Sequence, residues 1–477
     1  MPKINWPENK KSAICIIAND TLINSVKLCS TVAKLDTDMD IITDLLNIPQ
    51  EDVLSSSSSQ SENGSLIIDI TLVSKKFSCP SCGSYSTHIK DYRTKSITHS
   101  ALNSRSCLIR YRARRFVCTV CGRTFFESNP FLPSGHTISS LTVLHVLNEL
   151  KESNSTFSSV ARHNYISPTK AQEIFDLYVR IKRRTFPKIL CIDEVYALKD
   201  NHSKYVCLLL DFKSHQLIDM LPERKKYSLL NYFESISVGE RSNVQYFIMD
   251  MYQPYRDVVH FRFPKAKIAV DSFHVVKNIN DSLNAVRVRI MKGYKSNTVE
   301  YYLLKNFNWL LLEKEVREGK RRFNKRLNQY INYPQLLDRI LAISPELKEA
   351  YQIKDRYLLF NTYSDFSNAE KNFNEMMSLI RKSHIPEIVV IHKMLNNWKE
   401  EIINSFILVD GRRLSNGIME SRNSIVKLIK KTGNGYVNFA RFRNRCMYCM
   451  NRDALPCLSD AQLPIRMNGK KRGTYKK

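Results

Sequence analysis

The chain has 477 residues, of which 43% are hydrophobic, so it is long and apolar enough to form two to four domains with real cores. No apolar run approaches the roughly 18 residues of a membrane span, which excludes a transmembrane protein. Lysines and arginines outnumber acidic residues 73 to 46, and the net charge of +27 favours nucleic acid as a partner. A merely soluble basic surface is the alternative.

Residues 1–65 are expected to be an N-terminal extension that ends in a flexible linker. The linker is predicted from the serine run Ser55–Ser59 and the sequence SENGS that follows it. We therefore expect the ordered body to start near Leu66. The N-terminal run SAICIIA lacks a convincing cleavage site and is not interpreted as a signal peptide, so the twelve cysteines are expected to be mostly reduced.

Residues 66–130 contain two CxxC motifs separated by 35 residues. Each motif supplies two thiolates on a tight turn, and two such turns make a tetrahedral zinc site. The predicted zinc ligands are Cys79, Cys82, Cys118 and Cys121. The alternative is four unrelated cysteines, but the occurrence of two CxxCG motifs in one segment favours zinc. A hairpin is expected to fill the long gap between the motifs.

Arginines alternate with aromatic residues just before the second CxxC motif. Such a segment can contact DNA phosphates while the zinc holds the adjacent turn, although a solvated strand face would look the same. The predicted phosphate contacts are Arg110, Arg112, Arg114 and Arg115.

Residues 131–185 are predicted to be helical, with a helix-turn-helix motif between Thr156 and Arg184. Ser167 can cap the second helix, with Pro168 at its first position. In such a motif the second helix lies in a DNA groove, and here it would present Thr169, Lys170 and Gln172. A helical hairpin without DNA contact is the alternative.

Residues 186–290 contain short runs rich in Ile, Val, Tyr and Leu, which predict strands. Their expected order is three antiparallel strands followed by helix, strand, helix and strand, which is the order of an RNase H-like fold. Three of the strands are expected to stop at an aspartate, where the open end of an α/β sheet binds ligands. These aspartates are Asp193, Asp250 and Asp271.

Residues 291–405 are predicted to be a helical insertion, and residues 406–450 to return to the same catalytic domain. A helix that starts at Asn416 carries Glu420 and Lys427 on one face. The last segment, 451–477, is predicted to be a basic tail. The expected fold class is therefore multidomain α+β, with a zinc-binding domain, a helix-turn-helix and an RNase H-like α/β catalytic domain interrupted by the insertion.

The aspartates and Glu420 together favour metal-dependent phosphoryl transfer. Two Mg²⁺ ions roughly 3.5–4 Å apart can stabilise the entering and leaving oxygens of an in-line displacement, and Mg²⁺ prefers oxygen ligands. The alternative is that these acids only cap helices or pair with the many basic residues.

The order of these motifs resembles that of a known family. The zinc motifs, the helix-turn-helix and the sequences CIDE, MDMYQPY, FPKAKIAVDSFHVVK and SNGIMESRNSIVKLIKK are similar to those of bacterial insertion-sequence transposases of the ISL-three family. The resemblance covers about residues 68–450 and implies a DDE enzyme. It implies binding to the terminal inverted repeats of the element, end cleavage and strand transfer into target DNA.

Carried over by motif, the resemblance implies Asp193, Asp250 and Glu420 as the catalytic, Mg²⁺- or Mn²⁺-binding triad. Asp271 and His274 would support them, and Asp271 is the alternative second aspartate. The resemblance implies double-stranded DNA as the partner and a homodimer or larger assembly as the oligomeric state. It also implies that the protein is located in the bacterial cytoplasm, at the nucleoid. A catalytically inactive DNA-binding regulator derived from a transposase is the competing hypothesis.

Overall fold

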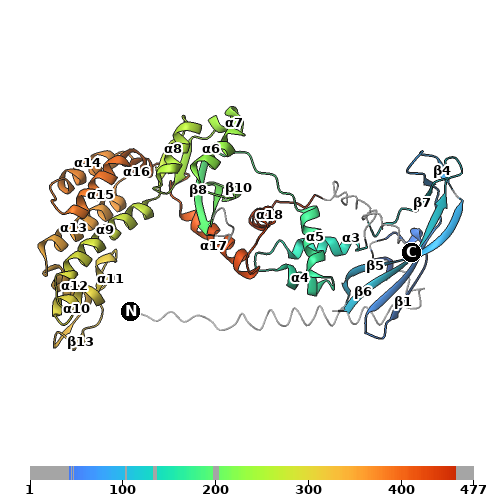
Figure 1. Cartoon of the computed structure of the whole chain (residues 1–477), viewed down its shortest axis with the longest axis horizontal. Helices are drawn as coiled ribbons and strands as arrows, with labels where there is room; N and C mark the ends of the chain where they lie inside the picture. Colours follow the sequence, from blue (N-terminus) through green and yellow to red (C-terminus); the bar gives the residue numbers. More distant parts are fainter. Residues whose placement is uncertain are drawn as a thin grey trace, which may run out of the picture. The chain divides into compact units, whose positions relative to one another are not determined.

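The computed structural model divides the chain into two compact units (Figure 1). Unit 1 comprises the described residues up to Glu149 together with Phe157–Ile174, and unit 2 comprises Leu150–Thr156 and the described residues from Phe175 onward. The described residues are 42–44, 46, 48–86, 88–102, 105–132, 137–196 and 204–457. Most of residues 1–47 and the tail 458–477 lie outside them, so the predictions made for those segments stay predictions.

Unit 1 is built on a five-stranded sheet that follows a short 3-10 turn, Gln50–Asp52. The strand order is β1-β2-β6-β5, with β7 also paired to β6. The bounds are β1 Val53–Gln60, β2 Leu66–Leu72, β5 Ile89–Leu102, β6 Arg105–Val117 and β7 Thr124–Phe126. The predicted hairpin between the two CxxC motifs is confirmed as the long antiparallel pair β5–β6. Alternate residues of β2 and β6, such as Ile68, Ile109 and Tyr111, fill the core of the unit.

The predicted serine-rich linker is wrong, because these residues form strand β1. It pairs antiparallel with β2, and Ser57 lies opposite Asp69. Only Val53 of β1 is buried, so the strand is held at the sheet edge by its backbone rather than by apolar side chains. The serine-rich composition therefore does not indicate strand β1. The folded part of unit 1 begins before Leu66, contrary to the prediction.

Three helices follow the zinc-binding segment: α3 Ser140–Glu149, α4 Phe157–His163 and α5 Pro168–Tyr178. The predicted succession of helix, short turn and helix is observed, and the Ser167 Oγ accepts a hydrogen bond of 3.1 Å from the Lys170 N–H. The second helix ends at Tyr178, several residues earlier than expected. The backbone beyond it bonds elsewhere: the Arg184 N–H donates to the Ile218 carbonyl.

Unit 2 contains a five-stranded mixed sheet with the order β10-β9-β8-β11-β12. Strands β8, β9 and β10 are antiparallel neighbours, whereas β11 runs parallel to both β8 and β12. The strand bounds are β8 Ile189–Tyr196, β9 Tyr205–Asp211, β10 Leu217–Leu221, β11 Tyr246–Met249 and β12 Lys267–Val270. The helices between and after them are α6 Lys226–Glu234, α7 Val238–Ser242, α8 Gln253–Arg262 and α9 Ser272–Lys292. Apart from the short α7, this is the element order expected from the sequence.

Helices cover both faces of this sheet. Leu190 and Ile192 of β8 belong to a core that includes side chains of α6, α8 and α9. Cys191 and Val195, on the opposite face, pack with α17 Gly417–Thr432 and α18 Phe439–Met450. The sheet is thus sandwiched, and α17 is the helix that covers the face on which Asp193 lies.

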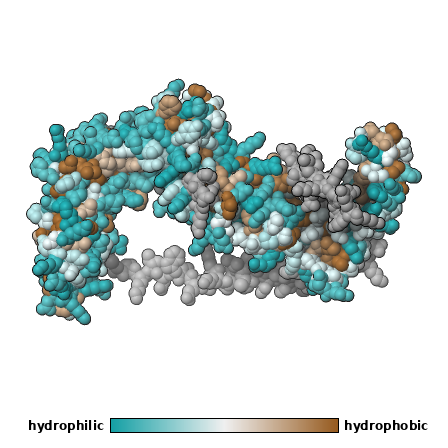
Figure 2. All heavy atoms as spheres, viewed as in Figure 1, coloured by the Kyte–Doolittle hydropathy of each residue, from teal (hydrophilic) through white to brown (hydrophobic). Residues whose placement is uncertain are grey.

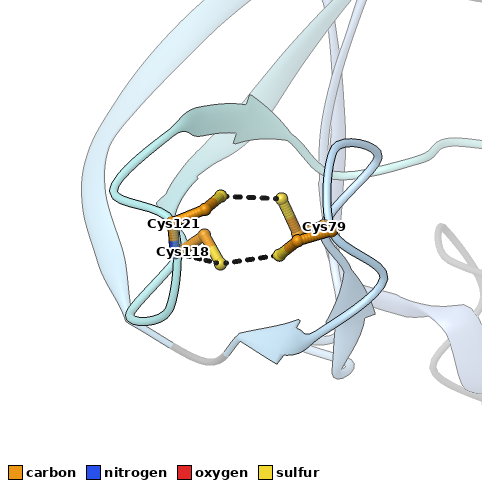
Figure 3. A group of neighbouring side chains, drawn as sticks. Cys79, Cys118 and Cys121 are labelled. Carbon is orange, nitrogen blue, oxygen red and sulfur yellow. Dashed lines mark hydrogen bonds between the residues drawn. The ribbon is translucent and has the colours of Figure 1, made fainter.

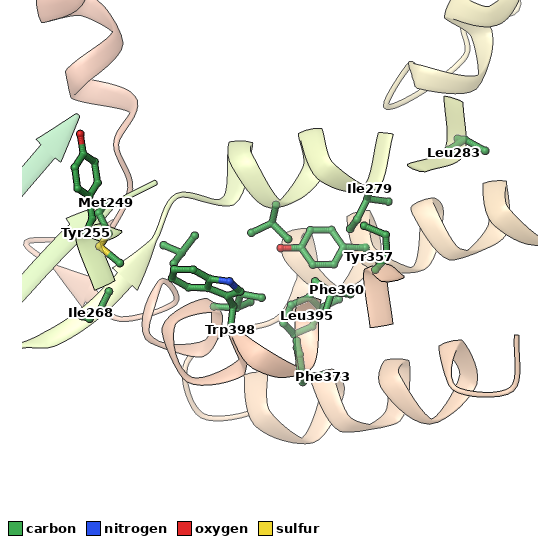
Figure 4. Close-up of a cluster of buried hydrophobic side chains, with 14 of the residues drawn as sticks. Met249, Tyr255, Ile268, Ile279, Leu283, Tyr357, Phe360, Phe373, Leu395 and Trp398 are labelled. Carbon is green, nitrogen blue, oxygen red and sulfur yellow. The ribbon is translucent and has the colours of Figure 1, made fainter. Parts of the chain in front are cut away.

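The predicted helical insertion is observed between α9 and α17. Its helices are α10 Val299–Asn306, α11 Asn308–Leu312, α12 Tyr333–Leu341, α13 Pro345–Tyr363, α14 Ala369–Ile380, α15 Pro386–Asn397 and α16 Lys399–Asn404. Two small hairpins accompany them: β13 Arg322–Asn324 with β14 Gln329–Ile331, and β15 Leu408–Val409 with β16 Arg412–Arg413. Tyr357, Phe360 and Trp398 continue the core that lies under β11 and α8 (Figure 4).

The surface seen in Figure 2 is mainly hydrophilic, with small apolar patches between the charged side chains. Among the described residues, none of the helices has the length and apolarity needed to cross a membrane.

Candidate functional site

Two turns of unit 1 bring four cysteine thiols together (Figure 3). The Sγ atoms of Cys79 and Cys121 are 3.7 Å apart, those of Cys82 and Cys118 are 3.5 Å apart, and all four lie within 4.8 Å of one another. Tetrahedral zinc with Zn–S bonds of about 2.3 Å requires S···S distances of about 3.8 Å. The four thiols therefore fit a structural zinc ion.

The same backbone turn builds both halves of this cluster. The Gly83 N–H donates to the Cys79 carbonyl at 2.8 Å, and the Gly122 N–H donates to the Cys118 carbonyl at 2.9 Å. Both glycines have a positive φ, +75° and +68°, which a residue with a Cβ adopts only with strain. The CxxCG pattern thus supplies the thiols and the turn together.

One of the four predicted phosphate-binding arginines is misassigned. The Arg114 side chain is only 5% exposed and pairs with Glu127 at 3.0 Å, and it also donates to the Leu72 carbonyl. Its position next to Ala113 breaks the strict alternation of β6, so both side chains are buried. Arg114 therefore holds the sheet together and does not reach DNA.

The other three arginines lie at the surface of unit 1. Arg110 and Arg112 are exposed and Arg115 is half-buried. Arg110 pairs with Asp69, Arg115 pairs with Asp91, and the Arg112 guanidinium stacks 4.4 Å from the Tyr92 ring centre.

The predicted DNA-contacting residues of α5 and α17 also reach the surface. Thr169 and Lys427 are exposed, and Lys170 and Gln172 are partly exposed. Lys170 forms an ion pair of 2.9 Å with Glu173 of its own helix.

Three aspartates form a row across the parallel part of the unit 2 sheet. Cys191 of β8 is paired with Ile248 of β11, which is paired in turn with Ala269 of β12. Two residues further along, on the same face of each strand, the register places Asp193, Asp250 and Asp271 side by side. Neighbouring strands are about 4.8 Å apart, so each carboxylate can interact with the next. We call these three residues the carboxylate row.

Asp193 does not end its strand, contrary to the prediction. Strand β8 continues to Tyr196 along β9, but its pairing with β11 stops at Cys191. Asp250 and Asp271 do directly follow β11 and β12. The parallel pairing of β8, β11 and β12 therefore ends just before the row, as the sequence predicted, although β8 continues to pair with β9.

His274, in the first turn of α9, extends the row. Its Nε2 lies 2.8 Å from an oxygen of Asp250, and Asp250, Asp271 and His274 can offer ligand atoms within 4.8 Å of one another. The Asp271 side chain caps α9 by accepting from the Phe273 N–H. Oxygen donors of this kind suit a hard divalent cation.

Helix α17 supplies the fourth side of the site. The Asn416 Nδ2 donates to the Ile192 carbonyl at 3.2 Å and to Asp250 at 3.3 Å, and the Asn423 Nδ2 donates to Asp193 at 2.6 Å. Glu420 lies four residues after the first asparagine and three before the second, on the same helix face. Its side chain is exposed. Among the described residues, no ion pair engages its carboxylate.

The surroundings of Asp193 and Asp271 favour the protonated forms of these two carboxyls. Burial, followed by the negative charge of Asp250, raises the pKa of Asp193 to about 7. Burial also raises the pKa of Asp271, and the hydrogen bond to Asp250 raises the pKa of His274. Such shifts identify a cluster of like charges whose charged form gains a cation readily.

Glu194, next to Asp193 in sequence, lies outside the row. It accepts a hydrogen bond of 2.8 Å from the Tyr255 hydroxyl and pairs with Arg224. These partners lie on the other face of the sheet, as the strand alternation predicted. Asn416 was predicted only as a helix start and was missed as a site residue, because an Asn-Gly pair normally signals a cap or turn.

Comparison with known proteins decides the family. A family model for the ISL-three (ISL3) transposases, described as "Transposase", matches residues 190–446, and a model described as "zinc-finger of transposase IS204/IS1001/IS1096/IS1165" matches residues 75–121. The chain belongs to the ISL3 transposase family. It is similar to "Transposase for insertion sequence element IS1001" of Bordetella parapertussis, with 21% identity over 378 residues, which is 78% of this chain and 88% of that protein. The first match contains the whole carboxylate row and α17, and the second contains all four zinc ligands.

Proposed function

We propose that this transposase has an RNase H-like catalytic domain that binds Mg²⁺ or Mn²⁺ and cuts and joins DNA. In this proposal it binds the terminal inverted repeats of its insertion sequence, cleaves the ends of the element and transfers them into target DNA. The single observation that carries the proposal is the carboxylate row at the open end of a sheet of order β10-β9-β8-β11-β12, covered by α17, the helix that carries Glu420.

Asp193, Asp250 and Glu420 are the proposed catalytic residues, with Asp271 and His274 in support. Divalent cations held by the three carboxylates would stabilise the entering and leaving oxygens of the phosphodiester. The central position of Asp250 in the row supports its choice over Asp271, which is engaged in capping α9. His274 holds the Asp250 carboxylate by its 2.8 Å contact. Water attacks the end of the element first, and the freed 3′-hydroxyl then attacks the target.

The surface of unit 1 supports the DNA-binding part of the proposal. Arg110, Arg112 and Arg115 are the proposed phosphate contacts on this surface. On the second helix of the proposed helix-turn-helix, Thr169 is exposed and Lys170 and Gln172 are partly exposed. Because two ends must be paired before transfer, we propose that the chain acts as at least a dimer, in the bacterial cytoplasm at the nucleoid.

The proposal is tested with a duplex that carries one terminal inverted repeat of the element, incubated with purified full-length protein and Mg²⁺ or Mn²⁺. Cleavage at the end of the element is expected for the wild type and for Asp281→Asn, an exposed aspartate of α9 outside the row. Asp193→Asn and Glu420→Gln should bind the repeat as the wild type does but cleave it more than about 100-fold more slowly, because even outer partners of metal ligands contribute 10–100-fold.

Two results would change the proposal. Binding of correctly paired ends by the wild type, without cleavage, would instead support a transposase-derived regulator. Cleavage that survives both substitutions would show that the reaction uses other residues.

A further inference from the structure

Two buried asparagines of unit 2 donate hydrogen bonds to the carboxylate row, but their amide oxygens have no hydrogen-bond partner among the described residues. Asn416 is 5% exposed and Asn423 is 9% exposed. The Nδ2 of each donates to a carboxylate, but within the described part of the chain the Oδ1 of each has no hydrogen-bond partner. A buried polar atom without a partner destabilises the folded state, so its presence in a folded protein calls for a reason.

The orientation of each amide is set by the acceptor that its Nδ2 faces, a backbone carbonyl for Asn416 and the ionised form of Asp193 for Asn423. The Asn416 Nδ2 faces the Ile192 carbonyl as well as Asp250, and a carbonyl only accepts. The Asn423 Nδ2 faces an oxygen of Asp193 at 2.6 Å. A flipped Asn416 amide would place its oxygen against the Ile192 carbonyl oxygen, and a flipped Asn423 amide would place its oxygen against the ionised Asp193 carboxylate. The unpartnered oxygens are therefore a property of the site.

Another buried asparagine of unit 2 uses both its amide nitrogen and its amide oxygen in hydrogen bonds. Asn451 is fully buried, and it accepts from the Leu217 N–H and donates to the Leu217 carbonyl, both at 2.9 Å. Its two amide atoms simply replace a strand neighbour. Asn416 and Asn423 have no such arrangement, and each instead meets a carboxylate.

Asn416 stands at the N-cap position of α17 but does not cap the helix with its side chain. It is the N-cap of α17, where an asparagine oxygen normally accepts from the second or third N–H of the helix, yet it forms no such side-chain bond. Its side chain donates to the Asp250 carboxylate and to the Ile192 carbonyl instead. Together with Asn423 on Asp193, the start of α17 thus contacts two members of the row, Asp193 and Asp250.

We infer that Asn416 and Asn423 are positioning residues that fix the carboxylate row to α17. They set the distance between the row and Glu420, which lies between them on the helix, and so shape the cation site that the three catalytic carboxylates are proposed to form. Their amide oxygens are buried without a partner among the described residues, so what each asparagine contributes to the site is the bond that its Nδ2 donates to a carboxylate. This inference rests on the proposed function, because it assigns these residues to the same cation site.

The test replaces each asparagine by leucine, which has nearly the same shape and lacks both the donor and the acceptor. Asn404→Leu is the matched control: Asn404 is 6% exposed and its Nδ2 donates to the Ile268 carbonyl of β12 at 2.9 Å, and among the described residues no hydrogen bond joins its side chain to a carboxylate. Mn²⁺ affinity of the full-length protein is measured by titration calorimetry without DNA, and the thermal unfolding temperature is recorded for each variant.

Asn416→Leu and Asn423→Leu should weaken Mn²⁺ binding by about 10–100-fold, the usual cost of losing a partner of a metal ligand. Asn404→Leu should lower the unfolding temperature but bind Mn²⁺ as the wild type does. Wild-type affinity in both leucine variants of α17 would overturn the inference, and so would an equal loss of affinity in Asn404→Leu. If the wild type itself neither binds Mn²⁺ nor cleaves DNA, it is the proposed function that fails, and the inference falls with it.

Discussion

Asp193 is a proposed catalytic residue whose pKa is raised by burial. Its pKa is near 3.9 in an unfolded chain and is raised to about 7 in the fold by burial and by Asp250. Between these two pH values the folded chain binds a proton that the unfolded chain lacks, so this group lowers the free energy of unfolding as pH rises from about 4 to about 7. Above pH 7 the full cost is present, unless a cation offsets it.

Asp193→Asn should therefore stabilise unit 2 in the presence of a chelator at pH 8, by about 1–3 kcal/mol, while abolishing cleavage. Thermal unfolding monitored by calorimetry at several pH values checks this. The gain should shrink as the pH falls below 7 and vanish below about 3, where the wild-type carboxyl is protonated in both states. A variant that is less stable than the wild type at pH 8 would contradict the assigned pKa shift.

Arg114 and Arg112 are two residues apart on β6, and the structure gives them opposite roles. Arg114→Ala leaves Glu127 buried without its partner, which should cost about 3–5 kcal/mol of stability. Arg112→Ala should change stability by less than about 0.5 kcal/mol, because the side chain is exposed, but should weaken DNA binding at low salt. Denaturant unfolding and a DNA-binding titration separate the two effects, and similar stability losses in both variants would refute the distinction.

At the scale of elements, the sequence predicted most of what depends on side-chain pattern. The apolar runs of β8 to β12 and the CxxCG motifs were recognised because burial and turn geometry demand particular residue types. Strand β1 was missed because its backbone, rather than its serines, pairs with β2. Burial of Arg114 was missed because the alternation of β6 fails at Ala113 and Arg114, and nothing in a single sequence marks such a break.

The candidate site was predictable to the same extent. Asp193, Asp250 and Asp271 were found because each follows or ends a run of apolar strand residues. Their common row depends on strand register, which a single sequence does not specify. The role of Asn416 could not be predicted either, because its side-chain hydrogen bonds are with residues 166 and 224 positions away.

The two zinc-binding turns are an element whose structure should depend on the ion. One zinc per chain is expected by elemental analysis, and Cys82→Ser should reduce that content well below one. Removing the zinc should unfold the turns around Gly83 and Gly122, because small zinc sites contribute directly to folding. Hydrogen exchange should then rise in β3 Phe77–Ser78, β4 Tyr85–Ser86 and β7. Unchanged exchange in these strands after chelation would show that the turns fold without metal.

At the scale of the whole molecule, the chain separates its tasks between two units. The four cysteines and the exposed arginines of β6 belong to unit 1, whereas the carboxylate row, Glu420 and both asparagines belong to unit 2. The split explains why the two family models match separate stretches of the chain. In this account unit 1 recognises DNA and unit 2 carries out the chemistry.

The central claim is that Asp193, Asp250 and Glu420 hold the catalytic cations, and exchanging each of them for cysteine tests it most directly. A thiolate is a poor ligand for Mg²⁺ and a better one for softer cations such as Mn²⁺. End cleavage by the three variants should be lost in Mg²⁺ and partly restored in Mn²⁺, whereas Asp271→Cys should show no such dependence on the metal. Rescue of Asp271→Cys but not of Asp250→Cys would contradict the account by making Asp271 the ligand, and full activity of any of the three in Mg²⁺ would remove that residue from the site.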